Sequence, residues 1–299
     1  MKIVVTAPTG AIGRQVLQRL VASGAEVRAI ARKPASIVPS LRERIEVIEG
    51  SHGDADVIDR ALVGADVLFW LAPPNFRAAR LEDVYEDFTR PACAAIARHA
   101  VARVVSISAL GRGTAVADRA GFVTASLAMD ELLANTGAAF RALTLPSFMD
   151  NLLRQLEPIR TQGVFFGQID GSRKLPLCAS RDIADAAARL LLDDTWTGRG
   201  HVAVLGPEDL SHDEMARILS DTLGVPVRYQ QLPLELSKAG FIKAGMSEVM
   251  AAGRIEMMWA KSRGLDNGEP RTAQNSTPTS FREWCVSVLR PALLEARVT

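Results

Sequence analysis

The N-terminal stretch of the chain constrains the fold more than any other part. A short β-branched run, Lys2–Val5, reaches a turn that contains Gly10 and Gly13, and an amphipathic helix follows at once. This order places a pyrophosphate at the helix N-terminus: Gly10 lets the backbone approach phosphate oxygens, and Gly13 lets the helix pack closely on the strand. The alternative is a helix-entry turn with no ligand. We predict a dinucleotide site formed by Ala7, Pro8, Thr9, Gly10, Ala11, Ile12 and Gly13.

The turn departs from the G-x-x-G-x-x-G pattern at its first position, which is Ala7. Alanine can serve there if its φ angle stays negative. Pro8 fixes its own φ angle and has no N–H group, so it stiffens the loop. The phosphate therefore has to bind other N–H groups of the turn.

Two cations, Arg32 and Lys33, follow the predicted strand Glu26–Ala31. NAD sites usually carry an acidic residue near this strand end, which binds the ribose 2′-hydroxyl. A guanidinium can instead hold a 2′-phosphate through two hydrogen bonds, and a lysine adds a point charge. The pair therefore favours NADP(H) as the cofactor, and the alternative is a solvated basic loop.

Composition excludes several other classes of protein. The 299 residues suffice for one large domain or one and a half. The chain has 35 basic and 34 acidic residues, and this balance gives no indication of a nucleic-acid or membrane partner. Cys93, Cys178 and Cys285 lie far apart, lack metal-ligand spacing and suit a reducing compartment. No apolar run reaches membrane-spanning length, and the chain begins with a strand rather than a signal peptide. We expect a cytoplasmic protein with no metal, and the sequence specifies no oligomeric state.

Apolar strands and helices alternate through the first half of the chain. Continuous apolar strands separated by helices predict an α/β fold with a doubly wound parallel (Rossmann) sheet, covered by helices on both faces. Further strands are expected at 45–48, 66–71, 103–108 and 140–145, and helices at 54–63, 82–99 and 127–135. Ligands of such sheets bind beyond the carboxyl ends of the strands. The expected rim therefore continues from the glycine turn and Arg32-Lys33 to Leu71, Ala72, Pro73, Ser108, Pro146 and Phe148.

The second half is expected to form a smaller α/β substrate domain. Ser211 and Glu214 make a capping box at the start of a helix. Other helices are predicted at 181–192, 234–243, 247–263 and 281–295, strands at 201–205 and 225–230, and a long loop at 266–280. We predict a dinucleotide domain over 1–146, to which 176–205 returns, and a substrate domain over 147–175 and 206–299.

The order of several motifs resembles the NmrA-like proteins, which are atypical short-chain dehydrogenases, across nearly the whole chain. These motifs are Thr6–Gly13, Arg32-Lys33-Pro34, Gly64-Ala65-Asp66, Pro146–Asn151, Asp182-Ile183-Ala184 and Gly206–Ser211. The resemblance implies an NADP-binding Rossmann domain with a small C-terminal domain over the nicotinamide. The family includes quinone reductases, aromatic-compound reductases and regulators that bind dinucleotide without turnover. It often has Gly-Asp where this chain has Gly50-Ser51-His52, which implies that Ser51 takes over an adenine contact.

The Tyr-x-x-x-Lys pair of ordinary short-chain dehydrogenases is absent. In those enzymes the tyrosine protonates the carbonyl oxygen and the lysine lowers its pKa. Tyr85 is followed four residues later by Thr89, and Tyr229 by Pro233. The resemblance places the lysine that many NmrA-like members keep at Ser126, four residues before Asp130. This absence argues against alcohol dehydrogenation and is compatible with quinones and enones, whose reduced forms are stabilised anions.

Catalytic residues remain unassigned, with Ser108 and Ser126 as weak candidates. Ser108 ends the fifth strand, where it would point toward the nicotinamide, although a strand-end serine more often caps the next turn. The four histidines, His52, His99, His201 and His212, are scattered and are not favoured as catalytic bases.

Some apolar side chains are candidates for lining a substrate pocket, although core packing accounts for most of them. They are Phe148, Met149, the loop residues Phe165-Phe166 between Gly163 and Gly167, and the Met246–Trp259 stretch.

The function favoured by these observations is an NADP(H)-dependent oxidoreductase that transfers hydride to an electron-poor, quinone-like or aromatic acceptor without a Tyr-Lys pair. Its substrate would be small and apolar or aromatic. The alternative is a non-catalytic NADP-binding redox sensor that acts through a protein partner. A sugar-nucleotide epimerase fits less well, because its chemistry also needs the missing pair.

Overall fold

The computed structural model describes residues 1–295, which group into two compact units. Unit 1 contains residues 1–109, 124–144 and 183–202, and unit 2 contains 110–123, 145–182 and the chain from 203 onward. This division differs from the predicted domains at their bounds. Residues 110–123 and 145–146 group with unit 2, and the return to unit 1 is restricted to 183–202.

Unit 1 is built on a seven-stranded sheet with the order β10-β6-β5-β4-β1-β2-β3. The strands are β1 (Lys2–Val5), β2 (Glu26–Ala31), β3 (Glu46–Glu49), β4 (Val67–Trp70), β5 (Arg103–Ala109), β6 (Ala139–Leu145) and β10 (Arg199–Ala203). The pairings from β3 to β5 are parallel, with Val4 opposite both Arg28 and Leu68. The predicted doubly wound sheet is confirmed, and the carboxyl ends of these strands share one edge.

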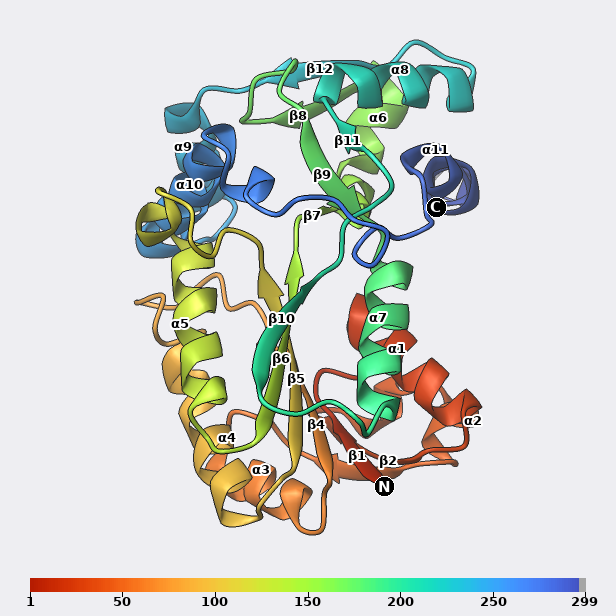
Figure 1. Ribbon diagram of the computed structural model, residues 1–299. Coiled ribbons are helices and arrows are strands. Elements are labelled where there is room, and N and C mark those ends of the chain that lie inside the picture. The colour runs from red at the N-terminus through yellow and green to blue at the C-terminus, as the bar shows by residue number, and fades with distance from the viewer. Residues whose placement is uncertain (296–299) are drawn as a thin grey trace. The chain divides into compact units, whose positions relative to one another are not determined.

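Helices cover both faces of this sheet (Figure 1). They are α1 (Ala11–Ala22), α2 (Pro39–Arg42), α3 (Ala55–Leu62), α4 (Glu86–Arg98), α5 (Phe122–Ala134) and α7 (Ser180–Leu192). One core, which includes Val4, Leu68 and Trp70, packs against α3, α4 and α5. On the other face α1 buries Val16, Leu17 and Leu20, and its Arg19 pairs with Asp185 of α7. Because both faces are covered, the central strand β4 is apolar and buried at every position, whereas the edge strands β3 and β10 carry charged residues.

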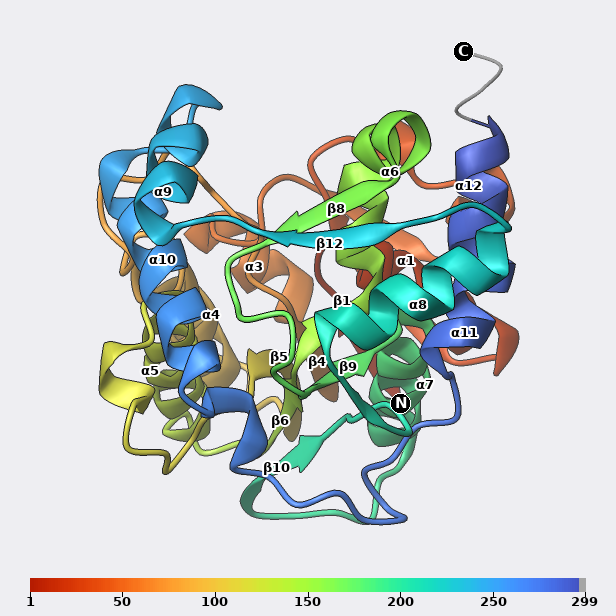
Figure 2. The same ribbon diagram turned by 90° about the horizontal axis from the view of Figure 1, so that it is seen from above.

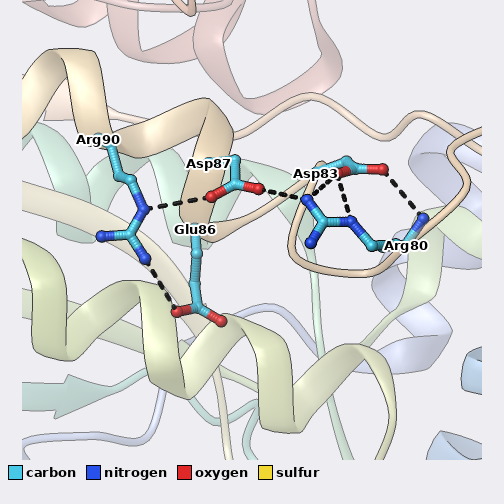
Figure 3. A network of polar contacts seen from close by, with 5 residues as sticks. All are labelled: Arg80, Asp83, Glu86, Asp87 and Arg90. Atoms are coloured by element: carbon cyan, nitrogen blue, oxygen red, sulfur yellow. Dashed lines mark hydrogen bonds and ion pairs between the residues drawn. The ribbon is translucent and has the colours of Figure 1, made fainter.

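Helix α4 begins at Glu86, four residues later than predicted. Glu86 and Asp87 lie in its first turn, where carboxylates interact favourably with the helix dipole. Arg80 bridges Asp83 and Asp87, and Arg90 pairs with Glu86 and Asp87 (Figure 3). Asp87 has an arginine partner on each side, and residues 82–85, which precede the helix, form turns rather than part of α4.

Unit 2 contains two small sheets. One has the order β11 (Asp209–Leu210), β9 (Leu175–Cys178) and β7 (Ser147–Phe148), and the other pairs β8 (Val164–Gly167) with β12 (Arg228–Gln231), side by side in Figure 2. The longer helices are α6 (Leu156–Gln162), α8 (His212–Leu223), α9 (Leu234–Lys243) and α10 (Glu248–Ser262). The capping box of Ser211 and Glu214 forms at α8 as predicted.

Several local predictions for unit 2 were wrong. Phe165 and Phe166 lie in strand β8 rather than in a loop, and Phe165 is fully buried against Tyr229. Met149 is also buried in the core of unit 2, so neither side chain is free to line a substrate pocket. The expected terminal helix is divided into α11 (Phe281–Trp284), a π-helical turn (Cys285–Leu289) and α12 (Arg290–Glu295).

Membrane spans are absent from the part of the chain that the structure describes. None of its helices combines the length and the apolar character needed to cross a bilayer.

Candidate functional site

The turn between β1 and α1 has the geometry of a phosphate-binding loop. Thr6 closes its entry: the Thr6 hydroxyl donates to the Phe69 carbonyl (2.9 Å) and accepts from the Leu71 N–H (2.9 Å). Ala7 has a φ of +49°, so the negative φ on which its suitability was expected to depend is not observed. The Gly10 N–H then donates to the Ala7 carbonyl (3.1 Å). The left-handed Ala7 thus turns the chain where glycine is usual.

The two glycines of the turn have different roles. A Cβ on Gly13 would lie 2.1 Å from the Ala7 carbonyl oxygen, so the packing of α1 on the turn requires glycine. A Cβ on Gly10 would meet only the Ala7 carbonyl oxygen at 3.4 Å, and Gly10 has an ordinary φ of −74°. The fold therefore does not explain Gly10, whereas close approach of a ligand does.

The N-terminus of α1 also suits an anion. Gly10 is its N-cap, no side chain caps the first turn, and that turn contains no acidic residue. Thr9, Gly10 and Ala11 are exposed, whereas Pro8 and Ile12 are buried. The N–H groups and positive end of the helix are thus available to a pyrophosphate, which the residues of this turn fit.

Arg32 and Lys33 follow β2 at the same edge of the sheet. Both side chains are exposed, and neither forms an ion pair with a carboxylate among residues 1–295. Arg28 of the same strand behaves differently, because it is buried and bonded to Glu46 and to the carbonyl oxygens of Ala61 and Val63. The two cations at the strand end are therefore available to a phosphate group.

His52 is a residue of this edge whose role the sequence did not indicate. It is buried after β3, where its ring is nearly perpendicular to the Trp70 and Phe88 rings that it contacts. Its Nε2 donates to the Leu71 carbonyl (3.0 Å). Burial lowers the pKa of His52 to about 4, so the ring is neutral at physiological pH. The neutral ring links the end of β3 to Leu71.

The remaining predicted cofactor residues fall in both units. Ser51 accepts a hydrogen bond from the Gly53 N–H (3.4 Å), and Leu71, Ala72 and Pro73 are half-buried beyond β4. These residues lie at the strand ends of unit 1 with the glycine turn. Pro146 and Phe148 belong to unit 2, where Phe148 pairs with Cys178 in the small sheet.

A buried carboxylate binds the serines of β5. The Ser108 hydroxyl donates to Asp130 Oδ2 (2.5 Å), and the Ser106 hydroxyl donates to Asp130 Oδ1 (3.1 Å). Asp130 is fully buried, and Ser126 lies one helical turn before it on α5, also buried. The two weak catalytic candidates, Ser108 and Ser126, are therefore neighbours of one carboxylate.

Neither tyrosine is arranged as a proton donor. Burial raises the pKa of Tyr85 to about 12, and Tyr85 packs against the core of unit 1. The Tyr229 hydroxyl donates to the Ile169 carbonyl (2.6 Å) within unit 2.

Two histidines have structural contacts. His212 stacks on Tyr229, and His99 pairs with Asp59. Within residues 1–295 no group of three or more His, Cys, Asp or Glu side chains is arranged to hold a metal.

Comparison with known proteins identifies the family. Residues 8–194 match the model of the NAD(P)H-binding family, which is more than half of the chain. The chain belongs to this family and is an NAD(P)H-binding oxidoreductase. It is 28% identical to a (4-alkanoyl-5-oxo-2,5-dihydrofuran-3-yl)methyl phosphate reductase of Streptomyces griseus, over 94% of this chain and 96% of that protein. It is 26% identical to an NAD(P)H azoreductase of Xenophilus azovorans, over 85% of each.

Solved structures share the fold. A nucleoside-diphosphate-sugar epimerase of Staphylococcus aureus gives a TM-score of 0.81 at 17% identity, covering 96% of this chain and 100% of that chain. The NADPH complex of an Escherichia coli quinone oxidoreductase gives 0.79 at 22%, covering 97% and 99%. A mutant NmrA gives 0.73 at 16%, covering 100% and 98%. The fold that the resemblance to NmrA-like proteins implied is confirmed.

Proposed function

We propose that this protein is an NADP(H)-dependent reductase of electron-poor conjugated acceptors, such as quinones and enones. The cofactor supplies a hydride when it is bound. Gly10 and the first turn of α1 bind its pyrophosphate, and Arg32 and Lys33 bind the 2′-phosphate. Thr6 and His52 fix the position of Leu71 at the edge where the cofactor lies.

The hydrogen bond from Ser108 to Asp130 is the observation that supports an electron-poor substrate as the hydride acceptor. Because Ser108 donates its proton to a buried carboxylate, its oxygen is left to accept a hydrogen bond rather than to protonate a substrate. Burial and the bond to Ile169 occupy the two tyrosines. An acceptor that becomes a stabilised enolate or phenolate needs no proton from the protein, because water can supply it after hydride transfer.

The names of the relatives support this class of acceptor. The Streptomyces griseus relative is named for a dihydrofuranone that carries an alkanoyl group and a phosphate ester, and an unsaturated lactone of this kind is an electron-poor acceptor. The Xenophilus azovorans relative is named for azo compounds, whose N=N bond also accepts a hydride. These acceptors share a low-lying π system rather than a carbonyl that needs protonation.

The test compares acceptors with one cofactor. NADPH is mixed with the protein and with phenyl-para-benzoquinone, an enone or an unactivated ketone, and absorbance of the reduced nicotinamide is followed. We expect kcat/KM for the quinone to exceed that for the ketone by about 10²–10⁴, which is the usual contribution of general acid catalysis. NADPH with deuterium at the hydride position should label the β-carbon of the enone.

A variant that cannot bind the cofactor, Gly10→Val, controls for reduction in free solution. Equal rates with the ketone and the quinone would contradict the choice of acceptor. Tight NADPH binding with no acceptor turned over would contradict catalysis altogether.

A further inference from the structure

The carboxyl edge of the unit 1 sheet extends on both sides of the phosphate-binding turn. In the strand order β5-β4-β1-β2, the turn after β1 has β2 on one side and β4 and β5 on the other (Figure 1). A dinucleotide carries its two nucleosides on opposite sides of its pyrophosphate. Because the proposed function places the adenosine 2′-phosphate on Arg32 and Lys33 after β2, the nicotinamide half extends the other way, across β4 toward β5.

Strand β5 continues past the end of its neighbour at this edge. Ser106 of β5 is opposite Trp70, the last residue of β4, and β5 goes on from there to Ala109. Ser108 therefore lies about 7 Å beyond the end of β4, which is two residues at the usual rise of a strand. Two strand spacings, about 10 Å, separate β5 from β1. A nicotinamide riboside attached to a pyrophosphate at the turn therefore reaches Ser108.

The Ser108 oxygen is a hydrogen-bond acceptor that the fold does not use. Ser108 is only 6% exposed, and its hydroxyl proton is donated to Asp130 Oδ2. Among the described residues, no group donates a hydrogen bond to the Ser108 oxygen. A serine oxygen has two lone pairs, and a buried acceptor without a donor costs free energy that a bound donor recovers.

Asp130 fixes the direction of this hydroxyl. It comes from α5, is fully buried, and accepts from Ser106 through its other oxygen. Two serine donors favour the ionised form of the carboxyl group, and an ionised carboxylate accepts hydrogen bonds without donating any. Ser108 is thus the donor in its bond to Asp130. The lone pairs of its oxygen are left for another donor.

From this arrangement we propose that Ser108 accepts a hydrogen bond from the carboxamide NH₂ group of the nicotinamide, and that Asp130 is the positioning residue that keeps Ser108 a hydrogen-bond acceptor. The inference rests on the proposed function, because it concerns the cofactor of the same reductase. The carboxamide NH₂ group is the only N–H donor on the nicotinamide ring. Holding it fixes the rotation of the ring about its bond to the ribose, so that one face of the ring is presented to the hydride acceptor.

A matched pair of oxidised cofactors tests for this hydrogen bond. NADP⁺ and its 3-acetylpyridine analogue carry the same charge, and in the analogue a methyl group replaces the NH₂ group. Calorimetric titration gives both dissociation constants without turnover. In the wild type we expect NADP⁺ to bind about three- to tenfold more tightly, the usual net contribution of one hydrogen bond. Ser108→Ala should reduce this ratio to about one, because neither cofactor then has the serine acceptor.

Two further variants separate a role toward the cofactor from a role in the fold. Asp130→Asn should also reduce the ratio, because its amide group can donate to the Ser108 oxygen and occupy it. Ser106→Ala is the matched control: it removes the other hydroxyl bound to Asp130, but Ser106 is fully buried opposite Trp70, away from the edge. Ser106→Ala should keep the wild-type ratio even if it lowers the melting temperature.

An unchanged ratio in Ser108→Ala, or equal affinities for the two cofactors in the wild type, would overturn the hydrogen bond. A wild-type ratio in Asp130→Asn would overturn the positioning role of Asp130.

The same titrations distinguish this inference from the proposed function. If the preference for NADP⁺ depends on Ser108 while no conjugated acceptor oxidises NADPH, the reductase activity fails and the hydrogen bond stands. If quinones are reduced and Ser108→Ala keeps the wild-type ratio, the activity stands and the hydrogen bond fails. No binding of NADP⁺ by the wild type would overturn both.

Discussion

Ser108 donates its hydroxyl proton to Asp130 across 2.5 Å, and both residues are buried in unit 1. The same carboxylate accepts a second hydrogen bond, from the hydroxyl of Ser106 on the same strand. Asp130 therefore connects the end of β5 to α5. The bond orients the Ser108 oxygen so that it can accept a hydrogen bond, and it connects β5 to α5.

The first prediction concerns this connection. Asp130→Ala leaves two buried hydroxyl groups without their acceptor and opens a small cavity, so we expect a loss of about 2–4 kcal/mol in the free energy of unfolding. Asp130→Asn keeps an acceptor oxygen and should lose less. Urea unfolding followed by circular dichroism measures both. A loss below about 1 kcal/mol for Asp130→Ala would show that the contact contributes little to the fold.

The second prediction concerns cofactor choice. Arg32→Ala should weaken NADPH binding by about 1.5–3 kcal/mol, the usual contribution of a charge-assisted hydrogen bond, and should barely change NADH binding. Calorimetric titration of both cofactors gives the two affinities. Arg42, a half-buried arginine at the end of α2, is a suitable control position. Equal losses for both cofactors would contradict the assignment of Arg32 to the 2′-phosphate.

The third prediction separates the two glycines of the turn. Gly10→Val should abolish NADPH binding and leave the fold largely intact, because a side chain at Gly10 would occupy the space that the pyrophosphate needs. Gly13→Ala should destabilise the fold itself, since its Cβ would lie 2.1 Å from the Ala7 carbonyl oxygen. Melting temperature and calorimetry distinguish the two effects. Full NADPH binding by Gly10→Val would move the phosphate site elsewhere.

The phosphate turn was predictable because its information is local. The strand, the two glycines and the helix occupy adjacent residues, and the apolar face that includes Val16, Leu17 and Leu20 has the helical period. The positive φ of Ala7 was not predictable, because a left-handed alanine is rare and only the packing of α1 on the turn requires it.

Other parts depend on contacts between distant residues. Strand β8 has four residues, the last of which is Gly167, and is too short for a clear alternation. Its pairing with β12 forms across more than sixty residues of chain. The role of His52 depends on Trp70, Leu71 and Phe88, which the fold brings to it.

The fourth prediction concerns Ser126, which stands where relatives often have lysine. Ser126→Lys would place an ammonium group one helical turn from Asp130, so we expect it to be neutral or mildly activating toward carbonyl acceptors rather than destructive. Steady-state rates with a quinone and a ketone measure the effect. A tenfold loss with the quinone would show that Ser126 itself has a role. If the wild type reduces unactivated ketones rapidly, with one essential acid in its pH profile, Ser108 is the first residue to test.

The last prediction concerns pH. Burial lowers the pKa of His52 to about 4 in the folded protein, against an ordinary value of 6.5. As pH falls below about 6.5 the unfolded chain takes up a proton that the folded chain refuses, so the free energy of unfolding falls until pH reaches about 4. The shift corresponds to a loss of up to about 3 kcal/mol. Burial also lowers the pKa of His212 to about 4, so protonation of His212 in the unfolded chain adds a loss of the same sign.

His52→Gln tests this source of acid sensitivity. The variant keeps an N–H donor for the Leu71 carbonyl and removes the titrating ring, so its free energy of unfolding should depend less steeply on pH between 6.5 and 4. His201→Gln, at an exposed position, is the control. Urea unfolding at a series of pH values gives the slopes, and an unchanged slope in His52→Gln would show that the buried ring is not a source of the acid sensitivity.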